Sequence, residues 1–232
     1  FLRELTGGIY FGERGRKNGG NTAFDTCTYD REEIQRLAKK GFELAMTRTK
    51  KLCCVDKANV LESSRLWRET VQAMEKDYPE VEVTYEFVDA VAMRLVQWPN
   101  SYDVLITENL FGDILTDEAS VISGSMGLMP SASVGTKIGL YEPIHGSFPQ
   151  AAGKDIANPL ATVLSAAMMF EMSFGLQKEG DLIRKIVDQS LSEGIVTEDL
   201  VKGDAKAYKT SEVGDYLASK IEIYKSSPGE VF

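Results

Sequence analysis

Two aspartates four residues apart are the side chains of this sequence best suited to chemistry. Asp113 and Asp117 follow the short apolar run 104–106, and the residues from Gly112 onward favour a helix, so a strand is expected to lead into a helix here. Positions i and i+4 share one helix face, where two carboxylates repel each other unless a cation lies between them. Oxygen ligands suit a hard divalent ion. The pair therefore predicts a site for Mg2+ or Mn2+, with a solvated acidic face as the alternative.

Two further charged residues lie where predicted strands end. Lys57 directly follows a strand expected at 52–55, and Asp89 follows an alternating strand expected at 81–88. In doubly wound sheets, functional residues gather beyond the carboxyl ends of the strands, so both are expected beside the aspartate pair. A nearby cation lowers the pKa of a lysine, which would let Lys57 act as a base. For Lys57 or Asp89 taken alone, a solvated loop residue is the alternative.

The single histidine lies among small residues. His145, Gly146, Ser147 and Phe148 form a segment whose backbone a nucleotide phosphate could approach closely. A turn histidine with satisfied hydrogen bonds is the alternative. The sequence carries no GxGxxG, Walker lysine loop, GxSxG or HExxH motif, which leaves conventional Rossmann, kinase-like, hydrolase and zincin assignments without support.

Composition limits the classes of function. The 232 residues are 43% hydrophobic, enough for one or two compact domains, and the net charge of −9 argues against nucleic-acid or anionic-membrane partners. Polar residues such as Glu171 interrupt the longest apolar stretch, 159–176, which predicts a buried helix rather than a membrane span. The three cysteines form no disulfide framework, and no secretory signal is expected, so the predicted location is cytoplasmic.

Alternating strand-like and helix-like segments predict an α/β fold. Asp30 and Glu33 form a capping box that predicts a helix to about residue 49. An apolar stripe over 66–74 predicts a second helix that ends before Pro79, and further helices are expected near 158–175, 181–193 and 210–224. The polar, glycine-rich segment 12–29 predicts a hairpin arm. A shift toward Gly, Ser and Pro over 123–153 predicts a domain junction, which divides the chain into 1–122 and 123–232.

Six segments of the chain resemble one enzyme family in order and spacing. They are RELTGGIYFGE at 3–13, VDKANVL at 55–61, VDAVAMRLV at 88–96, ENLFGDILTDEAS at 108–120, GLMPSAS at 127–133 and EPIHGSFPQAAGKDIANP at 142–159. Together they resemble the isopropylmalate branch of the metal-dependent β-decarboxylating dehydrogenases. The resemblance implies a two-domain α/β/α sandwich that here lacks its N-terminal strands and helices. It assigns 1–122 to a central substrate, metal and dimerisation domain, and 123–232 to the C-terminal part of a nucleotide-binding domain.

The resemblance implies a reaction and a metal site. The reaction is oxidative decarboxylation of 3-isopropylmalate to 4-methyl-2-oxopentanoate and CO2 with reduction of NAD, a step of leucine biosynthesis. Asp113 and Asp117 would bind Mg2+ or Mn2+ together with Asp89 of the partner subunit, which also contacts substrate. The cation would stabilise first an alkoxide and then an enolate. The expected assembly is thus a homodimer with shared active sites.

The remaining roles also follow from the resemblance. Arg3 would bind a substrate carboxylate with its planar guanidinium, Tyr10 would protonate the enolate, and Lys57 of the partner subunit would serve as the base. The residues expected at the adenosine and pyrophosphate of NAD are His145, Gly146, Ser147, Phe148, Gln150 and Asn158.

One family position differs in this chain. The family usually carries an aspartate where this chain has Gln150, a position associated with the ribose hydroxyls that distinguish NAD from NADP. A glutamine can still hydrogen-bond a hydroxyl, and no Lys or Arg stands at this position to receive a 2′-phosphate, so NAD is the predicted cofactor.

Three other functions are compatible with the sequence. A related 2-hydroxy-acid decarboxylating dehydrogenase, acting on tartrate, malate or homoisocitrate, is the first alternative, because substrate-recognising residues are expected upstream of the sequence. A noncatalytic regulatory subunit of the same family and a structural metal-binding module are the others. The chain is expected to match the C-terminal two-thirds of such an enzyme. Both an active protein and an inactive fragment are compatible with this expectation.

Overall fold

A four-stranded parallel sheet organises the first half of the chain. Its strands are β1 (Leu2–Arg3), β4 (Lys51–Asp56), β5 (Glu82–Phe87) and β6 (Val104–Thr107), in the order β1-β6-β4-β5. All neighbouring pairs run parallel. The carboxyl ends of the strands therefore meet at one edge of the sheet, and the segments that follow them begin there.

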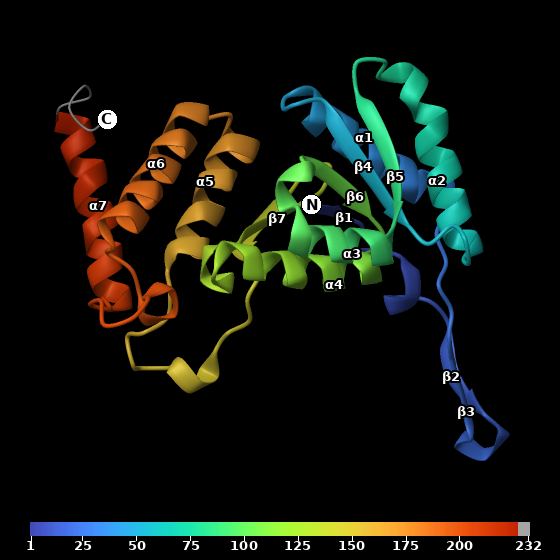
Figure 1. Cartoon of the computed structure of the whole chain (residues 1–232), viewed down its shortest axis with the longest axis horizontal. Helices are drawn as coiled ribbons and strands as arrows, with labels where there is room; N and C mark the ends of the chain where they lie inside the picture. Colours follow the sequence, from blue (N-terminus) through green and yellow to red (C-terminus); the bar gives the residue numbers. More distant parts are fainter. Residues whose placement is uncertain (227–232) are drawn as a thin grey trace. The chain divides into compact units, whose positions relative to one another are not determined.

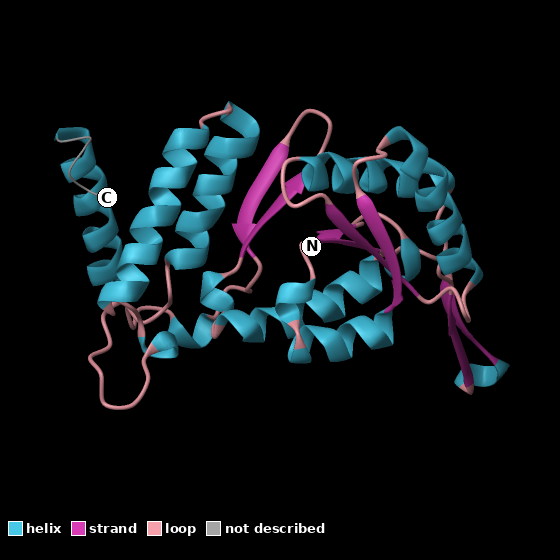
Figure 2. Ribbon diagram, turned by 45° about the horizontal axis from the view of Figure 1, so that its top comes forward, coloured by secondary structure: helices cyan, strands magenta, loops and turns pink. Residues whose placement is uncertain are grey.

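Helices cover both faces of this sheet, as Figures 1 and 2 show in the computed structural model. On one face lie α1 (Arg31–Met46) and α2 (Glu62–Met74), which pack on strand residues such as Cys54 and Ile106. On the other lie α3 (Val88–Gln97) and α4 (Asn109–Ser120), over residues such as Val55. Successive side chains of a strand point to opposite faces, so each strand contributes to two separate cores.

The structure describes residues 1–226 and divides the chain into two compact units. Unit 1 spans Phe1–Ile122, and unit 2 begins at Ser123. The division falls where the sequence shifts toward Gly, Ser and Pro. The functional roles that we assign to the two parts remain predictions.

Two helix boundaries show how local chemistry sets the ends of helices. The capping box predicted at the start of α1 is present, with Asp30 accepting from the Glu33 backbone and Glu33 accepting from the Asp30 backbone. The helix ends at Met46, three residues before the expected end. In α4 the expected start was wrong: the helix begins at Asn109 rather than Gly112, because the Glu108 carboxylate caps its first turn.

The helix α3 was missed by the sequence analysis. The strand was expected to continue to Val88 with Asp89 directly after it, whereas β5 ends at Phe87 and Asp89 lies in the first turn of α3. The apolar residues Val91 and Leu95 are four apart and both are buried against the sheet. Their spacing was the available signal for a helix.

A hairpin projects from unit 1 (Figure 1). Its strands β2 (Arg14–Lys17) and β3 (Thr22–Asp25) pair antiparallel within the segment where an arm was expected. The turn contains Gly19 and Gly20 with φ of 62° and 94°, a left-handed conformation that glycine adopts without strain.

Up to residue 226, unit 2 combines a strand pair with three helices. The strands β7 (Pro130–Val134) and β8 (Gly139–Pro143) pair antiparallel against α5 (Leu160–Phe174), and α6 (Gln177–Glu193) and α7 (Thr210–Ser226) follow. The strand pair was not predicted, since its segment was interpreted only as a junction. The core of this unit consists of Leu160, Ile186, Val187, Val213 and Leu217.

Short 3-10 turns connect the longer elements. They are η1 (Gly8–Tyr10), η2 (Asn18–Gly20), η3 (Glu75–Asp77), η4 (Pro99–Ser101), η5 (Val121–Ser123), η6 (Met126–Leu128), η7 (Pro149–Ala151) and η8 (Glu198–Leu200).

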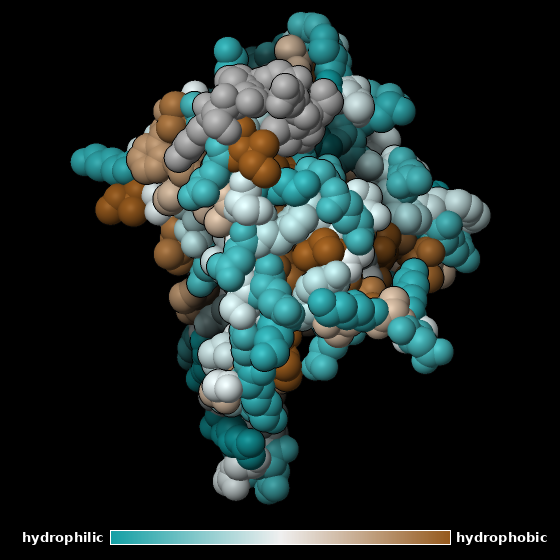
Figure 3. Space-filling view, turned by 90° about the vertical axis from the view of Figure 1, so that its left-hand side faces the viewer, coloured by the Kyte–Doolittle hydropathy of each residue, from teal (hydrophilic) through white to brown (hydrophobic). Residues whose placement is uncertain are grey.

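The surface is mainly hydrophilic in the view of Figure 3, with separate hydrophobic patches. The expectation of a buried helix at 159–176 is correct for only part of α5. Leu160 and Ala167 are fully buried, but Met172 and Phe174 are 55% and 59% exposed. Within residues 1–226, no helix combines the length and the apolar character that a membrane crossing requires.

Candidate functional site

Three of the predicted site residues meet in unit 1. The Arg3 Nη1 lies 2.8 Å from Asp113 Oδ1, and the Tyr10 hydroxyl donates a hydrogen bond of 3.0 Å to Asp113 Oδ2. The Arg3 guanidinium is 5.9 Å from the centroid of the Tyr10 ring. Arg3 ends β1, Tyr10 ends η1 and Asp113 lies in α4, so three elements bring this Arg3–Tyr10–Asp113 cluster together.

The electrostatics of the cluster keep Tyr10 protonated and leave Arg3 able to bind a carboxylate. The hydrogen bond to the Asp113 carboxylate raises the pKa of Tyr10, so the phenol carries its proton at neutral pH. The side chains of Arg3 and Asp113 are 24% and 46% exposed. An ion pair this accessible adds only about 0–1 kcal/mol to folding stability. Its main effect is to orient the guanidinium, whose exposed part can still bind an anion.

The second aspartate of the pair lies on the same helix. Asp117 is exposed, one turn along α4 from Asp113. Two carboxylates fit a Mg2+ or Mn2+ site, because such ions commonly take one or two protein carboxylates and complete their shell with substrate oxygens and water. In the described part of the chain, no three His, Cys, Asp or Glu side chains gather as a metal-binding group. Any ligands beyond Asp113 and Asp117 would therefore come from substrate, water or another chain.

Lys57 and Asp89 form a second pair. The Lys57 ammonium donates to the Asp89 carboxylate, and this hydrogen bond lowers the pKa of Asp89. The Lys57 Nζ also lies 5.9 Å from the centroid of the Phe87 ring. The two residues follow β4 and β5, whereas the Arg3–Tyr10–Asp113 cluster belongs to β1 and the segment after β6. Asp89 is thus not grouped with Asp113 and Asp117 in one chain.

A buried ion pair beside Lys57 was missed by sequence reasoning. Asp56 is 1% exposed and receives two hydrogen bonds from Arg68, of 2.7 and 3.0 Å. The backbone N–H of Lys57 donates to Ser64 at 3.0 Å. Together these contacts fix the turn from which Lys57 extends. The available signal was a charged residue directly at the end of an apolar strand.

The predicted nucleotide residues of unit 2 lie in a more exposed segment. Gly146, Ser147, Phe148 and Gln150 are exposed, and the His145 Nδ1 lies 2.9 Å from the carbonyl oxygen of its neighbour Gly146. Phe148 has a φ of 43°, in the left-handed region that is uncommon for residues other than glycine. Phe148 is 54% exposed.

Asn158 is held by contacts that the sequence did not reveal. Its Oδ1 accepts from the Leu160 N–H and its Nδ2 donates to Asp199, each at 3.0 Å. Asp199 also accepts from Ser125 and Thr197. Desolvation disfavours the charged form of Asp199, but these hydrogen bonds outweigh it and lower the pKa of the carboxyl. Asp199 therefore orients Asn158 while remaining ionised.

Comparisons with known proteins identify the family of the chain. The family model for isocitrate/isopropylmalate dehydrogenase matches residues 1–217. The chain belongs to this family. The 3-isopropylmalate dehydrogenases of Desulfitobacterium hafniense and Bacteroides fragilis are 54% and 55% identical to it over 220 residues, which is 95% of this chain. The chain spans about 62% of the length of these curated relatives.

Solved structures support the fold of this family member. An isocitrate dehydrogenase from Methylococcus capsulatus superposes with a TM-score of 0.86 at 35% identity, over 93% of this chain and 65% of the other. A β-decarboxylating dehydrogenase from Thermococcus kodakarensis gives 0.81 at 37% identity, over 94% and 62%. The resemblance and the fold class predicted from sequence motifs are thereby confirmed.

Proposed function

We propose that the protein takes part in the oxidative decarboxylation of 3-isopropylmalate with NAD and a divalent cation. The observation that carries the proposal is the Arg3–Tyr10–Asp113 cluster, which brings together a guanidinium able to bind an anion, a protonated phenol and a carboxylate able to bind a metal ion. The relatives named 3-isopropylmalate dehydrogenase support this substrate over isocitrate, since they are above 50% identical whereas the solved isocitrate dehydrogenase is 35% identical. A cytoplasmic location and a role in leucine biosynthesis belong to the same proposal.

Each residue would contribute a separate action. When bound, the cation held by Asp113 and Asp117 supplies stabilisation of oxygen anions, and NAD accepts hydride. Arg3 binds a carboxylate of the substrate through its planar fork of N–H donors. Lys57 of the partner subunit would take the proton of the substrate hydroxyl, and Tyr10 would give a proton to the substrate carbon after CO2 has left.

A homodimer with shared sites accounts for the two separate clusters. Within one chain Lys57 is paired with Asp89, away from the aspartate pair of α4. A second copy can bring the partner subunit's Lys57 and Asp89 to the Arg3–Tyr10–Asp113 cluster. A two-fold interface is reciprocal, so each subunit would both give and receive these residues.

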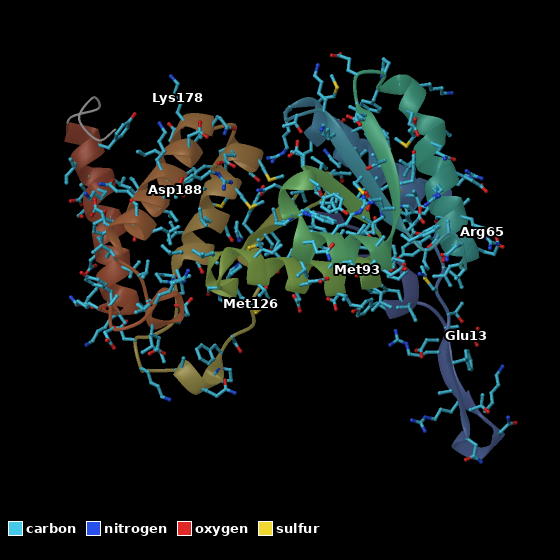
Figure 4. All side chains as sticks on the ribbon, in the orientation of Figure 1. Glu13, Arg65, Met93, Met126, Lys178 and Asp188 are labelled. Atoms are coloured by element: carbon cyan, nitrogen blue, oxygen red, sulfur yellow. The ribbon has the colours of Figure 1, made fainter. Side chains whose placement is uncertain are left out.

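An exposed apolar surface on α3 and α4 supports this assembly. Met93 and Val96 of α3 are 61% and 70% exposed, and Ile114 of α4 is 56% exposed. Figure 4 labels Met93 on α3. Apolar groups that gather on adjacent helices commonly mark a protein interface. We therefore place the dimer contact on α3 and α4.

The assay for this function measures NADH formation with 3-isopropylmalate, Mn2+ and NAD. Isocitrate, tartrate, malate and homoisocitrate serve as competing substrates, and Tyr10→Phe is the matched inactive control. We expect the highest kcat/KM with 3-isopropylmalate. A higher kcat/KM with another acid would make that acid the substrate. In a protein of the full length of the relatives, ligand binding without turnover would favour a regulatory subunit.

A further inference from the structure

A buried asparagine joins two parts of the Arg3–Tyr10–Asp113 cluster. Asn109 is the first residue of α4 and is 2% exposed. Its Oδ1 accepts a hydrogen bond from Arg3 Nε at 3.0 Å, and its Nδ2 donates to the carbonyl oxygen of Gly7 at 3.1 Å. Gly7 directly precedes the turn η1 that ends at Tyr10. One side-chain amide thus connects the segments carrying the guanidinium and the phenol.

The backbone of Asn109 is itself fixed by Tyr29. The Tyr29 hydroxyl accepts from the Asn109 N–H at 2.9 Å and donates to the Glu108 carboxylate at 2.7 Å. The same carboxylate accepts from the backbone N–H groups of Leu110 and Phe111. Because these bonds form the start of α4, Asn109 cannot shift without disrupting the first turn of the helix.

Two glycines allow close packing around this asparagine. A Cβ at Gly8, where φ is 76°, would lie 2.0 Å from the Tyr29 hydroxyl. A Cβ at Gly112 would lie 2.7 Å from Cγ of Arg3. The Arg3 stem therefore lies directly against α4, and η1 closes directly over Tyr29. Van der Waals contact prevents the Arg3 stem and η1 from moving closer to α4 and Tyr29. Hydrogen bonds are needed to keep them from moving away.

We propose that Asn109 is a positioning residue that holds Arg3 and the turn η1 in the one arrangement in which Arg3 and Tyr10 both reach Asp113. The importance of that arrangement for turnover rests on the proposed function, whereas the positioning itself is a property of the chain. A guanidinium without the Asn109 acceptor keeps a single strong contact, to Asp113, and can rotate about its stem. The Gly7 carbonyl without the amide donor loses its link to α4.

Hydrogen exchange measured by NMR on the full chain tests this role directly. The signals are the Arg3 Nε–H, which reports the bond to Asn109, and the Gly8 backbone N–H, which donates to Thr28 and reports the entry into η1. The variant Asn109→Ala should accelerate exchange at both sites by about tenfold or more. The Arg3 site loses a hydrogen bond of a charged group, and near Gly8 the Gly7 carbonyl is left without its donor.

A conservative variant separates the two halves of the interaction. Asn109→Asp keeps an oxygen for Arg3 and removes the donor to Gly7. It should leave the Arg3 Nε–H protected within about threefold while the Gly8 N–H exchanges about tenfold faster. This variant carries the test even where Asn109→Ala fails to fold.

The matched control is Thr70→Val. Thr70 is 1% exposed and hydrogen-bonds Arg31 and Leu66, so its loss destabilises unit 1 without contact to the cluster. Equal acceleration of the Arg3 Nε–H in Asn109→Ala and Thr70→Val, at matched unfolding free energy, would reduce Asn109 to a structural residue and overturn the proposal. The proposal would also be overturned if the Arg3 Nε–H exchanged as fast in Asn109→Asp as in Asn109→Ala. The readout needs neither substrate nor cofactor, so its failure leaves the proposed function intact.

Discussion

The candidate residues of unit 1 and those of the segment 145–150 in unit 2 are held in different ways. In unit 1, Tyr10 and Asp113 meet although they are 103 positions apart, and Arg3 meets Asn109 across 106 positions. In unit 2, the hydrogen bond of His145 is to its neighbour Gly146, and the residues that follow are exposed. Directional bonds between distant segments pre-organise a site before a ligand arrives, whereas an exposed loop becomes ordered on binding. We therefore expect substitutions in unit 1 to have the larger effects.

The largest expected effect is on metal binding. The double variant Asp113→Asn with Asp117→Asn keeps the shape of both side chains but removes their charges. Binding of Mn2+ should weaken by more than about 100-fold, because metal ligands contribute more than the outer residues whose loss typically costs 10–100-fold. Calorimetry on the full chain measures it. Glu118→Gln, a charge loss on the same helix, is the control, and unchanged binding in the double variant would place the metal elsewhere.

The next effect tests whether the sites are shared between subunits. In a protein of the full length of the curated relatives, the variants Lys57→Ala and Asp113→Ala should each be nearly inactive. Mixed in equal amounts, half of the dimers are heterodimers with one intact site, so activity should recover to about a quarter of the parent value. NADH formation after subunit exchange, verified by mass spectrometry, provides the measurement. A mixture as inactive as its components would mean that Lys57 acts within its own chain.

A smaller effect is expected from Asp199 in unit 2. Desolvation raises the pKa of Asp199, but its hydrogen bonds outweigh this effect, and the pKa is lowered in the folded state. A depressed carboxyl pKa stabilises the fold above the unfolded value of about 4, and this stability is lost as pH falls through the folded pKa. Asp199→Asn should therefore flatten the acid limb of the unfolding free energy, by less than about 1 kcal/mol because the group is partly exposed. Urea unfolding between roughly pH 2 and pH 7, the range over which the carboxyl titrates, measures this effect. Asp188→Asn is the control.

The smallest effect concerns cofactor choice at an exposed residue. The parent enzyme should prefer NAD over NADP, because Gln150 offers no cation to a 2′-phosphate. Gln150→Asp should increase this preference by only about tenfold or less, since one hydrogen bond to a ribose hydroxyl changes. Steady-state kcat/KM with both cofactors decides it. A parent that prefers NADP would show that other residues set the choice.

The sequence by itself determined the local elements and the chemistry of single residues. The capping box of Asp30 and Glu33 placed the start of α1, because both partners lie within one turn. Apolar residues placed β4 and β5 to within a residue or two, since alternation and burial act over neighbouring positions. The six motifs identified the family, because their spacing carries information that no single residue does.

Only the tertiary structure decided which side chains meet. The contacts among Arg3, Tyr10 and Asp113 depend on the strand order β1-β6-β4-β5, which local periodicity does not encode. The role of Asn109 was hidden for the same reason: an asparagine at a helix start is common, and its partners lie at Arg3 and Gly7. Local preferences act through neighbouring backbone and side-chain sterics, whereas a site forms where packing brings distant segments within the 3 Å or so of a hydrogen bond.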